Sequence, residues 1–171
     1  MNNVTQPKIS LRPVREEDPE FLYEVYFSTR QAEVEQFGWD RPQVEAFVRM
    51  QFNARQAAYK MRFPLAVHEV IIVGETPAGR LIVDRSDGQI LLTDIAVLPQ
   101  FQGKGVASHV VRGLQKEAAT SGALLILHVD KINAYAIGFY KNLGFETVAE
   151  TQLMNEMKWT AARELIDYGK K

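Results

Sequence analysis

The chain has 171 residues, enough for one domain, and its 46% hydrophobic and 24% charged residues are ordinary for a soluble globular protein. With 20 Lys and Arg against 21 Asp and Glu, the net charge of −1 gives no strong field that would draw the chain to nucleic acid or to a membrane. The absence of cysteine excludes disulfides, thiolate catalysis and Cys-ligated zinc.

The first ninety residues predict a strand, two helices and two further strands. In order, these are a strand at 8–13, a helix beginning at Asp18-Pro19, a helix from 40 to about 61, and strands at 64–73 and 80–84. The sequence Thr-Pro-Ala-Gly at 76–79 predicts a turn between the last two strands. No signal peptide and no apolar run of membrane-spanning length is visible, so a cytoplasmic location is expected.

The second half predicts helices alternating with strands. The expected elements are a strand at 90–98, a helix from 103 to about 121, a strand at 124–129, a helix from about 133 to 142, strands at 145–149 and 153–159, and a helical tail at 160–171. The order β-α-α-β-β-β-α-β-α-β-β predicts a single α/β domain over 1–171, with a mixed sheet covered by helices. The strand–helix–strand unit at 90–129 predicts a parallel pair.

A glycine-rich turn, Gln102-Gly103-Lys104-Gly105-Val106-Ala107, lies between a buried strand and an amphipathic helix. Its glycines let a ligand approach the backbone closely, and the bare amides and positive dipole of the helix start suit a phosphate or diphosphate. A tight turn without a ligand is the alternative. The spacing does not fit a P-loop, and Ser108 weakens a dinucleotide-binding interpretation.

Two motifs in this half resemble those of the GCN5-related N-acetyltransferase superfamily. The first is Val97-x-Pro99-x-x-Gln102-Gly103-x-Gly105-x-Ala107, and the second is Asn133-x-x-Ala136-x-x-Phe139-Tyr140-x-x-Leu143-Gly144-Phe145. They occur in the order and at the spacing of that family, and the predicted element order is also similar to the family's. The resemblance therefore extends over nearly the whole chain.

This resemblance implies a mixed, mostly antiparallel sheet with a splayed parallel pair, and acetyl-CoA as cofactor. Amides around 103–107 would hold the CoA pyrophosphate, and an amide near Val97 would polarise the acetyl carbonyl. Tyr140 would protonate the departing thiolate. The implied cofactor-binding residues are Ile95, Ala96, Val97, Gln102, Gly103, Lys104, Gly105, Val106, Ala107, Asn133, Ala136, Phe139 and Tyr140.

The chemistry also requires a base, because an alkylamine attacks a thioester only after it loses its proton. Asp94 interrupts an apolar strand and is the candidate, although it could instead pair with an Arg or Lys across the sheet. Glu33 and Glu35 are alternatives. His128 is expected to be a core or edge histidine rather than a base.

Two candidate residues have structural alternatives as well. Tyr140 could be an ordinary half-buried aromatic with a solvated hydroxyl. Asn133 could cap its helix, with or without a contact to the cofactor. The segment 31–40 holds carboxylates and aromatic rings that could wall a pocket for a cationic amine, or it could be a solvated loop.

The leading hypothesis is an enzyme that transfers acetyl from acetyl-CoA to a primary amine of a small molecule, or of a peptide or protein N-terminus, by direct attack in a ternary complex. A non-catalytic acyl-CoA-binding sensor and a nucleotide-dependent oxidoreductase are the alternatives. No metal and no nucleic-acid or membrane partner is expected. The chain is expected to be a monomer or a homodimer.

Overall fold

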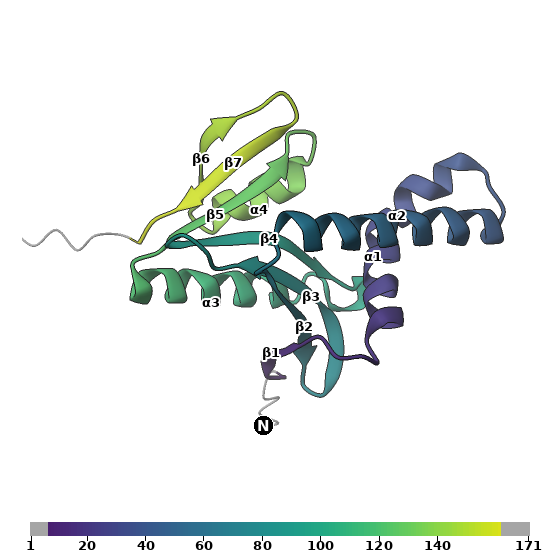
Figure 1. Ribbon diagram of the computed structural model, residues 1–171, viewed down its shortest axis with the longest axis horizontal. Helices are drawn as coiled ribbons and strands as arrows, with labels where there is room; N and C mark the ends of the chain where they lie inside the picture. Colours follow the sequence, from purple (N-terminus) through teal and green to yellow (C-terminus); the bar gives the residue numbers. More distant parts are fainter. Residues whose placement is uncertain (1–6, 162–171) are drawn as a thin grey trace, which may run out of the picture.

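The computed structural model describes residues 7–161 (Figure 1). Its elements follow the predicted order. They are β1 (Ile9–Pro13), α1 (Pro19–Val34), η1 (Glu35–Phe37), α2 (Arg41–Arg62), β2 (Val67–Val73), β3 (Thr76–Asp84), β4 (Gln89–Val97), η2 (Pro99–Phe101), α3 (Val106–Ser121), β5 (Leu124–Asp130), α4 (Ala134–Asn142), β6 (Glu146–Glu150) and β7 (Met154–Trp159), where η marks a short 3-10 helix.

The strands form one seven-stranded sheet in the order β1-β2-β3-β4-β5-β7-β6. Within residues 7–161, only β4 and β5 are parallel neighbours, and every other pair is antiparallel. A parallel pair needs a long crossover connection, and α3 supplies it here. The predicted mixed, mostly antiparallel sheet with one parallel pair is confirmed.

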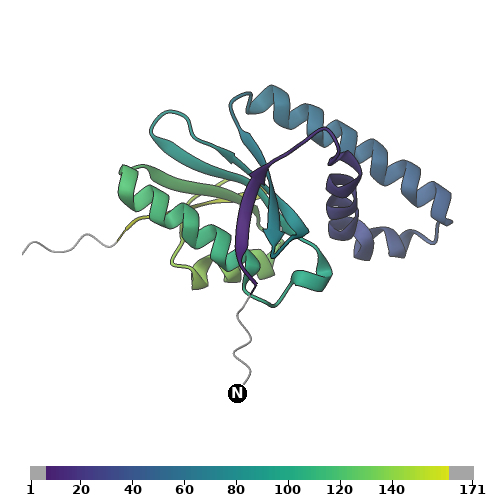
Figure 2. The same ribbon diagram turned by 90° about the horizontal axis from the view of Figure 1, so that it is seen from below.

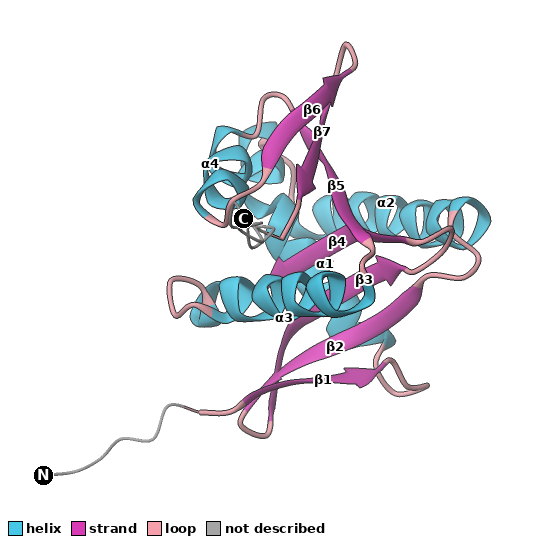
Figure 3. Ribbon diagram, turned by 90° about the vertical axis from the view of Figure 1, so that its left-hand side faces the viewer, coloured by secondary structure: helices cyan, strands magenta, loops and turns pink. Residues whose placement is uncertain are grey.

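Helices cover both faces of the sheet. The α1–α2 pair lies on one side and α3 on the other (Figures 2 and 3). Because side chains alternate along a strand, β2 contributes Ile71 to the core under α3, and Val70 and Ile72 to the core under α1 and α2. The sheet is thus buried from both sides, and the two helical layers are kept apart by it.

The parallel pair separates half-way along its length. Pairing of β4 with β5 runs from Gln89↔Leu124 to Leu92↔Leu127 and then stops. Beyond that point β4 pairs only with β3, and β5 only with β7. Thr93 is the extra residue of a bulge between β3 and β4, and a bulge bends its strand. A gap therefore opens in the middle of the sheet.

The predicted turn at 76–79 is wrong. The chain reverses at Gly74, whose φ of 66° is left-handed, and β3 already begins at Thr76. Pro77 is tolerated because it lies beyond the last β3–β4 pair, Gly79↔Val97. Gly79 serves close packing instead, since a side chain there would collide with the carbonyl oxygen of Ala96.

The helix predicted from residue 103 begins three residues later, at Val106. Gly103 and Gly105 have φ values of 70° and 75°, which are incompatible with a right-handed helix. The tail predicted to be helical lies outside the described residues, apart from Thr160 and Ala161. Among residues 7–161, no helix is both long enough and apolar enough to span a bilayer.

Asp18 ties the start of α1 to the end of β1. Its carboxylate accepts two hydrogen bonds from the Arg12 guanidinium, at 2.7 and 2.8 Å, and one from the Arg15 amide at 2.7 Å. The side chain is almost fully buried. The hydrogen bonds from Arg12 are the largest cause that lowers the pKa of Asp18 to about 2.

We expect Asp18→Asn to lower the free energy of unfolding at neutral pH by about 2 kcal/mol. Because the folded-state pKa lies below its ordinary value, this stabilisation is present above about pH 4 and is lost as the pH falls toward 2. Urea unfolding from pH 7 to pH 2.5 should show the variant and wild type converging. Glu17→Gln, which breaks an exposed pair with Arg15, is the control and should cost less than about 0.5 kcal/mol. Equal stability of Asp18→Asn and wild type at pH 7 would contradict this account.

Candidate active site

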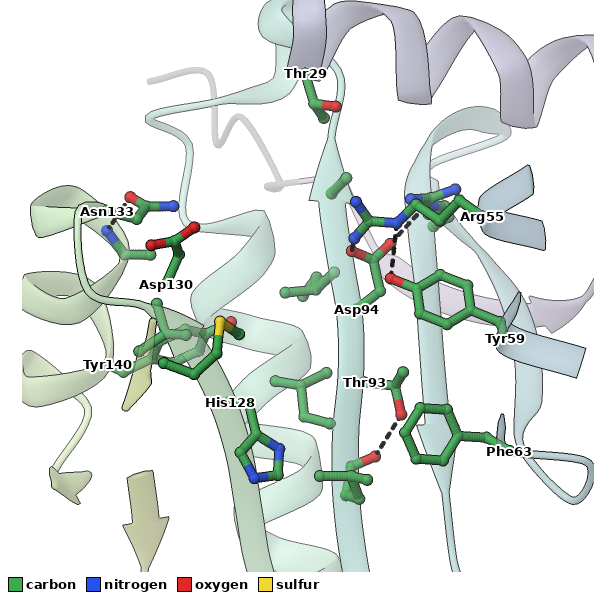
Figure 4. A pocket seen from close by; sticks show the side chains of 18 of the residues that line it. Thr29, Arg55, Tyr59, Phe63, Thr93, Asp94, His128, Asp130, Asn133 and Tyr140 are labelled. Carbon is green, nitrogen blue, oxygen red and sulfur yellow. Dashed lines mark hydrogen bonds and ion pairs between the residues drawn. The ribbon is translucent and has the colours of Figure 1, made fainter. Parts of the chain in front are cut away.

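The gap between β4 and β5 widens into a cleft of about 700 Å³ (Figure 4). Its walls come from both strands, from α4 and the turn before β7, and from α2 and the end of α1. Tyr140, Asn133 and Asp130 lie on one side in Figure 4, and Asp94, Arg55 and Tyr59 lie on the other. The cleft therefore brings together residues that are far apart in the sequence.

Tyr140 forms part of the α4 wall. Its ring packs against Phe139 and Phe145, with ring centroids 5.1 and 5.5 Å away, and only 9% of the residue is exposed. Burial, with a smaller contribution from the negative charge of Asp94, raises the pKa of Tyr140 above its ordinary value. The phenol consequently keeps its proton at neutral pH and can act as a donor.

Asn133 lies at the start of α4 and lines the same wall. Its side-chain oxygen accepts a hydrogen bond from the Ala136 amide at 3.0 Å, so the predicted N-cap is confirmed. This bond uses the side-chain oxygen of Asn133, and the side-chain NH₂ has no hydrogen-bond partner among the described residues. Asn133 can therefore cap the helix and still donate a hydrogen bond into the cleft.

The glycine-rich turn connects the end of β4 to α3. The side-chain Nε2 of Gln102 donates a hydrogen bond of 2.8 Å to the Val97 carbonyl, which holds the turn against the strand. The first helical hydrogen bond runs from the His109 amide to the Gly105 carbonyl, so the three amides at 106–108 have no partner within the helix. No atom lies within 4 Å of where a side chain at Gly103 or Gly105 would begin. The turn thus offers open space beside unpaired amides.

The predicted site residues fall into three groups. Those that line the cleft are Asp94, Ile95, Ala96, Asn133, Ala136 and Tyr140. Those whose side chains pack in the core under α3 are Val97, Val106, Ala107 and Phe139. Those in the exposed turn are Gln102, Gly103, Lys104 and Gly105. Residues of the second and third groups do not line the cleft.

Asp94 makes the ion pair that the sequence left open as an alternative to a base. One carboxylate oxygen lies 2.6 Å from Nε of Arg80, although the two groups are not aligned as a hydrogen bond. The other lies 3.3 Å from Nη2 of Arg55. Asp94 is therefore held between a guanidinium from β3 and another from α2.

The structure adds three residues that sequence reasoning missed. Arg55 and Tyr59 lie one turn apart on α2, and the Arg55 Nε donates a hydrogen bond of 2.8 Å to the Tyr59 hydroxyl. Arg80 is 3% exposed and lies in β3, next to the buried apolar run Leu81–Val83. A charge within each of two predicted strands, Arg80 and Asp94, was the available signal for their pairing. Nothing in the sequence connected α2 to them.

The carboxylates of 31–40 do not wall the cleft. Glu33 pairs with Arg30 at 2.7 Å, Glu35 accepts a hydrogen bond from Gln31, and Asp40 caps α2. None of the three lines the cleft. The hypothesis of an acidic pocket wall in this segment is wrong, because each carboxylate is engaged locally.

His128 faces the cleft across from Thr93, at the point where β4 and β5 separate (Figure 4). Its Nε2 lies 3.1 Å from a carboxylate oxygen of Glu156 on the neighbouring β7. The imidazole is partly exposed. His128 is thus a partly exposed side chain in the cleft wall and not a core residue. In residues 7–161, His, Asp and Glu side chains form no cluster of three suited to a metal ion.

Comparisons with known proteins give a consistent result. A family model described as the acetyltransferase (GNAT) family matches residues 20–145, which include both motifs. YjcF, an uncharacterized N-acetyltransferase of Bacillus subtilis (strain 168), is 32% identical over 89 residues, or 52% of this chain; the chain spans only 61% of that relative.

Among solved structures, the PaiA N-acetyltransferase of Thermoplasma acidophilum in complex with coenzyme A has a TM-score of 0.65 at 17% identity, covering 89% of this chain and 99% of its own. The ribosomal-protein-S18-alanine N-acetyltransferase of Escherichia coli has a TM-score of 0.60 at 21% identity, covering 92% and 99%. These likenesses show a shared fold.

Proposed function

Because the chain belongs to the acetyltransferase (GNAT) family, we propose that it transfers acetyl from acetyl-CoA to a primary amine of a small molecule by direct attack in a ternary complex. The observation that carries this proposal is the gap between β4 and β5. It has a bare-amide turn at the end of β4 and a protonated phenol, Tyr140, in its wall.

The turn before α3 fits the diphosphate of coenzyme A. Three unpaired amides at 106–108 lie at the positive end of a sixteen-residue helix, next to open space at Gly103 and Gly105. The edge of β4 beyond Leu92 is free of β5 and would lie along the pantetheine arm. Bound there, acetyl-CoA supplies a thioester carbonyl as the acyl donor.

Three side chains that line the cleft could take the proton from the incoming ammonium group: Asp94, His128 and Asp130. Asp130 lies at the end of β5, beyond the point where the strands separate, and one of its oxygens already accepts a hydrogen bond from the Ile132 amide. Both oxygens of Asp94 already face guanidinium groups, whereas His128 is engaged only through Nε2. In the tautomer whose Nε2–H donates to Glu156, the lone pair of Nδ1 is available to accept a proton. We expect His128 to be the main acceptor and Asp94 to position Arg55.

Tyr140 completes the proton transfers. The amine nitrogen forms a bond to the acetyl carbon, the carbon–sulfur bond breaks, and the sulfur leaves with the electron pair. The buried Tyr140 hydroxyl donates its proton to this sulfur, and the amine's second proton, released after attack, restores the phenol through water. The proton first taken up by the base leaves to solvent, so the products are an amide and the free thiol of coenzyme A.

The proposal predicts release of free thiol when purified protein is mixed with acetyl-CoA and a panel of primary amines. His128→Gln should lower kcat by about 10²-fold or more near neutral pH, because the base is lost. Its rate should recover as the pH approaches the amine's own pKa, where free amine is abundant. Asp94→Asn should show no such recovery, because it removes the charge that balances Arg55 and Arg80. The pH–rate profiles of the two variants measure this difference.

Two outcomes would contradict the proposal. Tight binding of coenzyme A without thiol release for any amine would favour the non-catalytic sensor. Absence of coenzyme A binding would remove the proposed function altogether. Recovery at high pH by Asp94→Asn, but not by His128→Gln, would assign the base to Asp94.

A further inference from the structure

The α1–α2 side of the cleft is strongly cationic. Asp94 is the carboxylate that lines this side. Four arginines line it as well: Arg30, Arg55, Arg62 and Arg80. Glu33 neutralises Arg30 from outside the cleft. Two positive charges are therefore left without a balancing carboxylate on this side, although the protein as a whole has a net charge of −1.

Several guanidinium N–H groups here have no hydrogen-bond partner among the described residues. Nη1 of Arg80 and Nε of Arg30 are buried without one. Arg55 uses Nε for Tyr59 and Nη2 for Asp94, which leaves Nη1 free next to the cleft. Buried donors without acceptors are costly, and a ligand oxygen would relieve that cost.

The phosphates of coenzyme A do not account for this charge. The turn that suits the diphosphate leads into α3, which covers the opposite face of the sheet from α1 and α2 (Figure 2), and residues 102–105 do not line the cleft. Arg55 and Asp94 instead lie together across the cleft from Asn133 and Tyr140 (Figure 4), and Arg80 contacts the same carboxylate. Asp130 lies on the same side of the cleft as Asn133 and Tyr140, across from Arg55 (Figure 4), and one of its carboxylate oxygens accepts a hydrogen bond from the Ile132 amide.

We propose that the acceptor is an amine that also carries an acidic group, a carboxylate or a phosphate, which Arg55 binds while the amine points into the gap between β4 and β5. This inference rests on the proposed acetyl transfer and narrows its substrate class. A guanidinium presents its N–H groups as a planar fork that matches the oxygens of both acids. The half-exposed Arg55 is the arginine that an entering substrate can reach, and the buried Arg80 holds Asp94 in place behind it.

Matched substrate pairs test the proposal. Each α-amino acid is compared with its amide, and ethanolamine phosphate with ethanolamine, by thiol release with acetyl-CoA. We expect kcat/KM for the acidic member of at least one pair to exceed that of its neutral partner by about 10- to 100-fold, the value of hydrogen bonds to a charged group. The two sets of pairs distinguish a carboxylate from a phosphate.

Arg55→Gln should abolish most of this preference, because it should lower kcat/KM for the acidic member of a pair about 10-fold or more beyond any loss with the neutral partner. Arg55→Lys, which keeps the charge but not the fork, should retain part of it. Arg41→Gln is the matched control, because Arg41 lies on the same helix, pairs only with Glu45 and does not line the cleft. Thermal unfolding of each variant verifies folding. A structural role of Arg55 would slow both members of a pair equally.

The outcomes separate this inference from the function on which it rests. Neutral amines used as well as acidic ones would overturn the inference and leave acetyl transfer intact. The inference would also be overturned if neither member of any pair were acetylated while calorimetry showed coenzyme A binding. No affinity for coenzyme A would overturn the proposed function, and the inference with it.

Discussion

Replacing Tyr140 by phenylalanine is expected to lower kcat by about 10²-fold or more and to leave the affinity for coenzyme A within about threefold of wild type. Burial raises the pKa of Tyr140, so the phenol is protonated and can supply the proton that the departing thiolate needs. The variant keeps the aromatic ring and loses this proton donor. The hydroxyl makes no hydrogen bond within residues 7–161, so the free energy of unfolding should change by less than about 1 kcal/mol. Steady-state kinetics, calorimetry and urea unfolding measure the three quantities.

Tyr135→Phe is the matched control, since Tyr135 lies on the same helix, is 85% exposed and does not line the cleft. It should be indistinguishable from wild type in all three measurements. If Tyr140→Phe keeps the wild-type kcat with an amine for which thiol release is rate-limiting, the thiolate leaves without this phenol. Tyr140 would then be the ordinary packed aromatic that the sequence also allowed.

The sequence predicted the parts of the fold that depend on local signals. Gly103 and Gly105 marked the turn before α3, and Asn133 marked the start of α4, because left-handed backbone and helix caps select particular residues. The incorrect prediction of a turn at 76–79 also came from a local signal. Thr-Pro-Ala-Gly has a turn-like composition, but the reversal is made by Gly74, and strand pairing with β2 determines the conformation that follows.

The acceptor side of the site could not be predicted, because it is assembled from separate elements. Asp94 on β4 contacts Arg80 on β3 and Arg55 on α2, and the sequence contains no periodicity that links these three positions. The motifs, in contrast, lie on β4, the following turn and α4, next to the gap where β4 and β5 part. Sequence therefore identified the side of the cleft proposed for acetyl-CoA and misjudged the charge of the other side.

The second large effect is expected for Gly105→Val, which should weaken coenzyme A binding at least about 10-fold in calorimetry. Two causes act in the same direction. A β-branched residue strains the left-handed backbone at φ 75°, at a cost of about 1–3 kcal/mol, and its side chain enters the open space at the turn that precedes the amides at 106–108. Only the added side chain would exclude a ligand directly. Apart from its chain neighbours, no described atom lies within 4 Å of the new Cβ position.

Gly122→Val separates the two causes. Gly122 caps the other end of the same helix at φ 72°, also with no atom within 4 Å of an added Cβ, so the substitution introduces similar strain away from the turn. Both variants should lose a similar amount of unfolding free energy, and only Gly105→Val should lose coenzyme A affinity. Wild-type affinity in both variants would mean that the amides at the start of α3 do not hold the diphosphate. Equal losses of affinity would mean that strain in α3, rather than occupied space, weakens binding. A loss confined to Gly105→Val would leave direct occupation of the diphosphate position as the cause, because backbone strain is matched between the two ends of the helix.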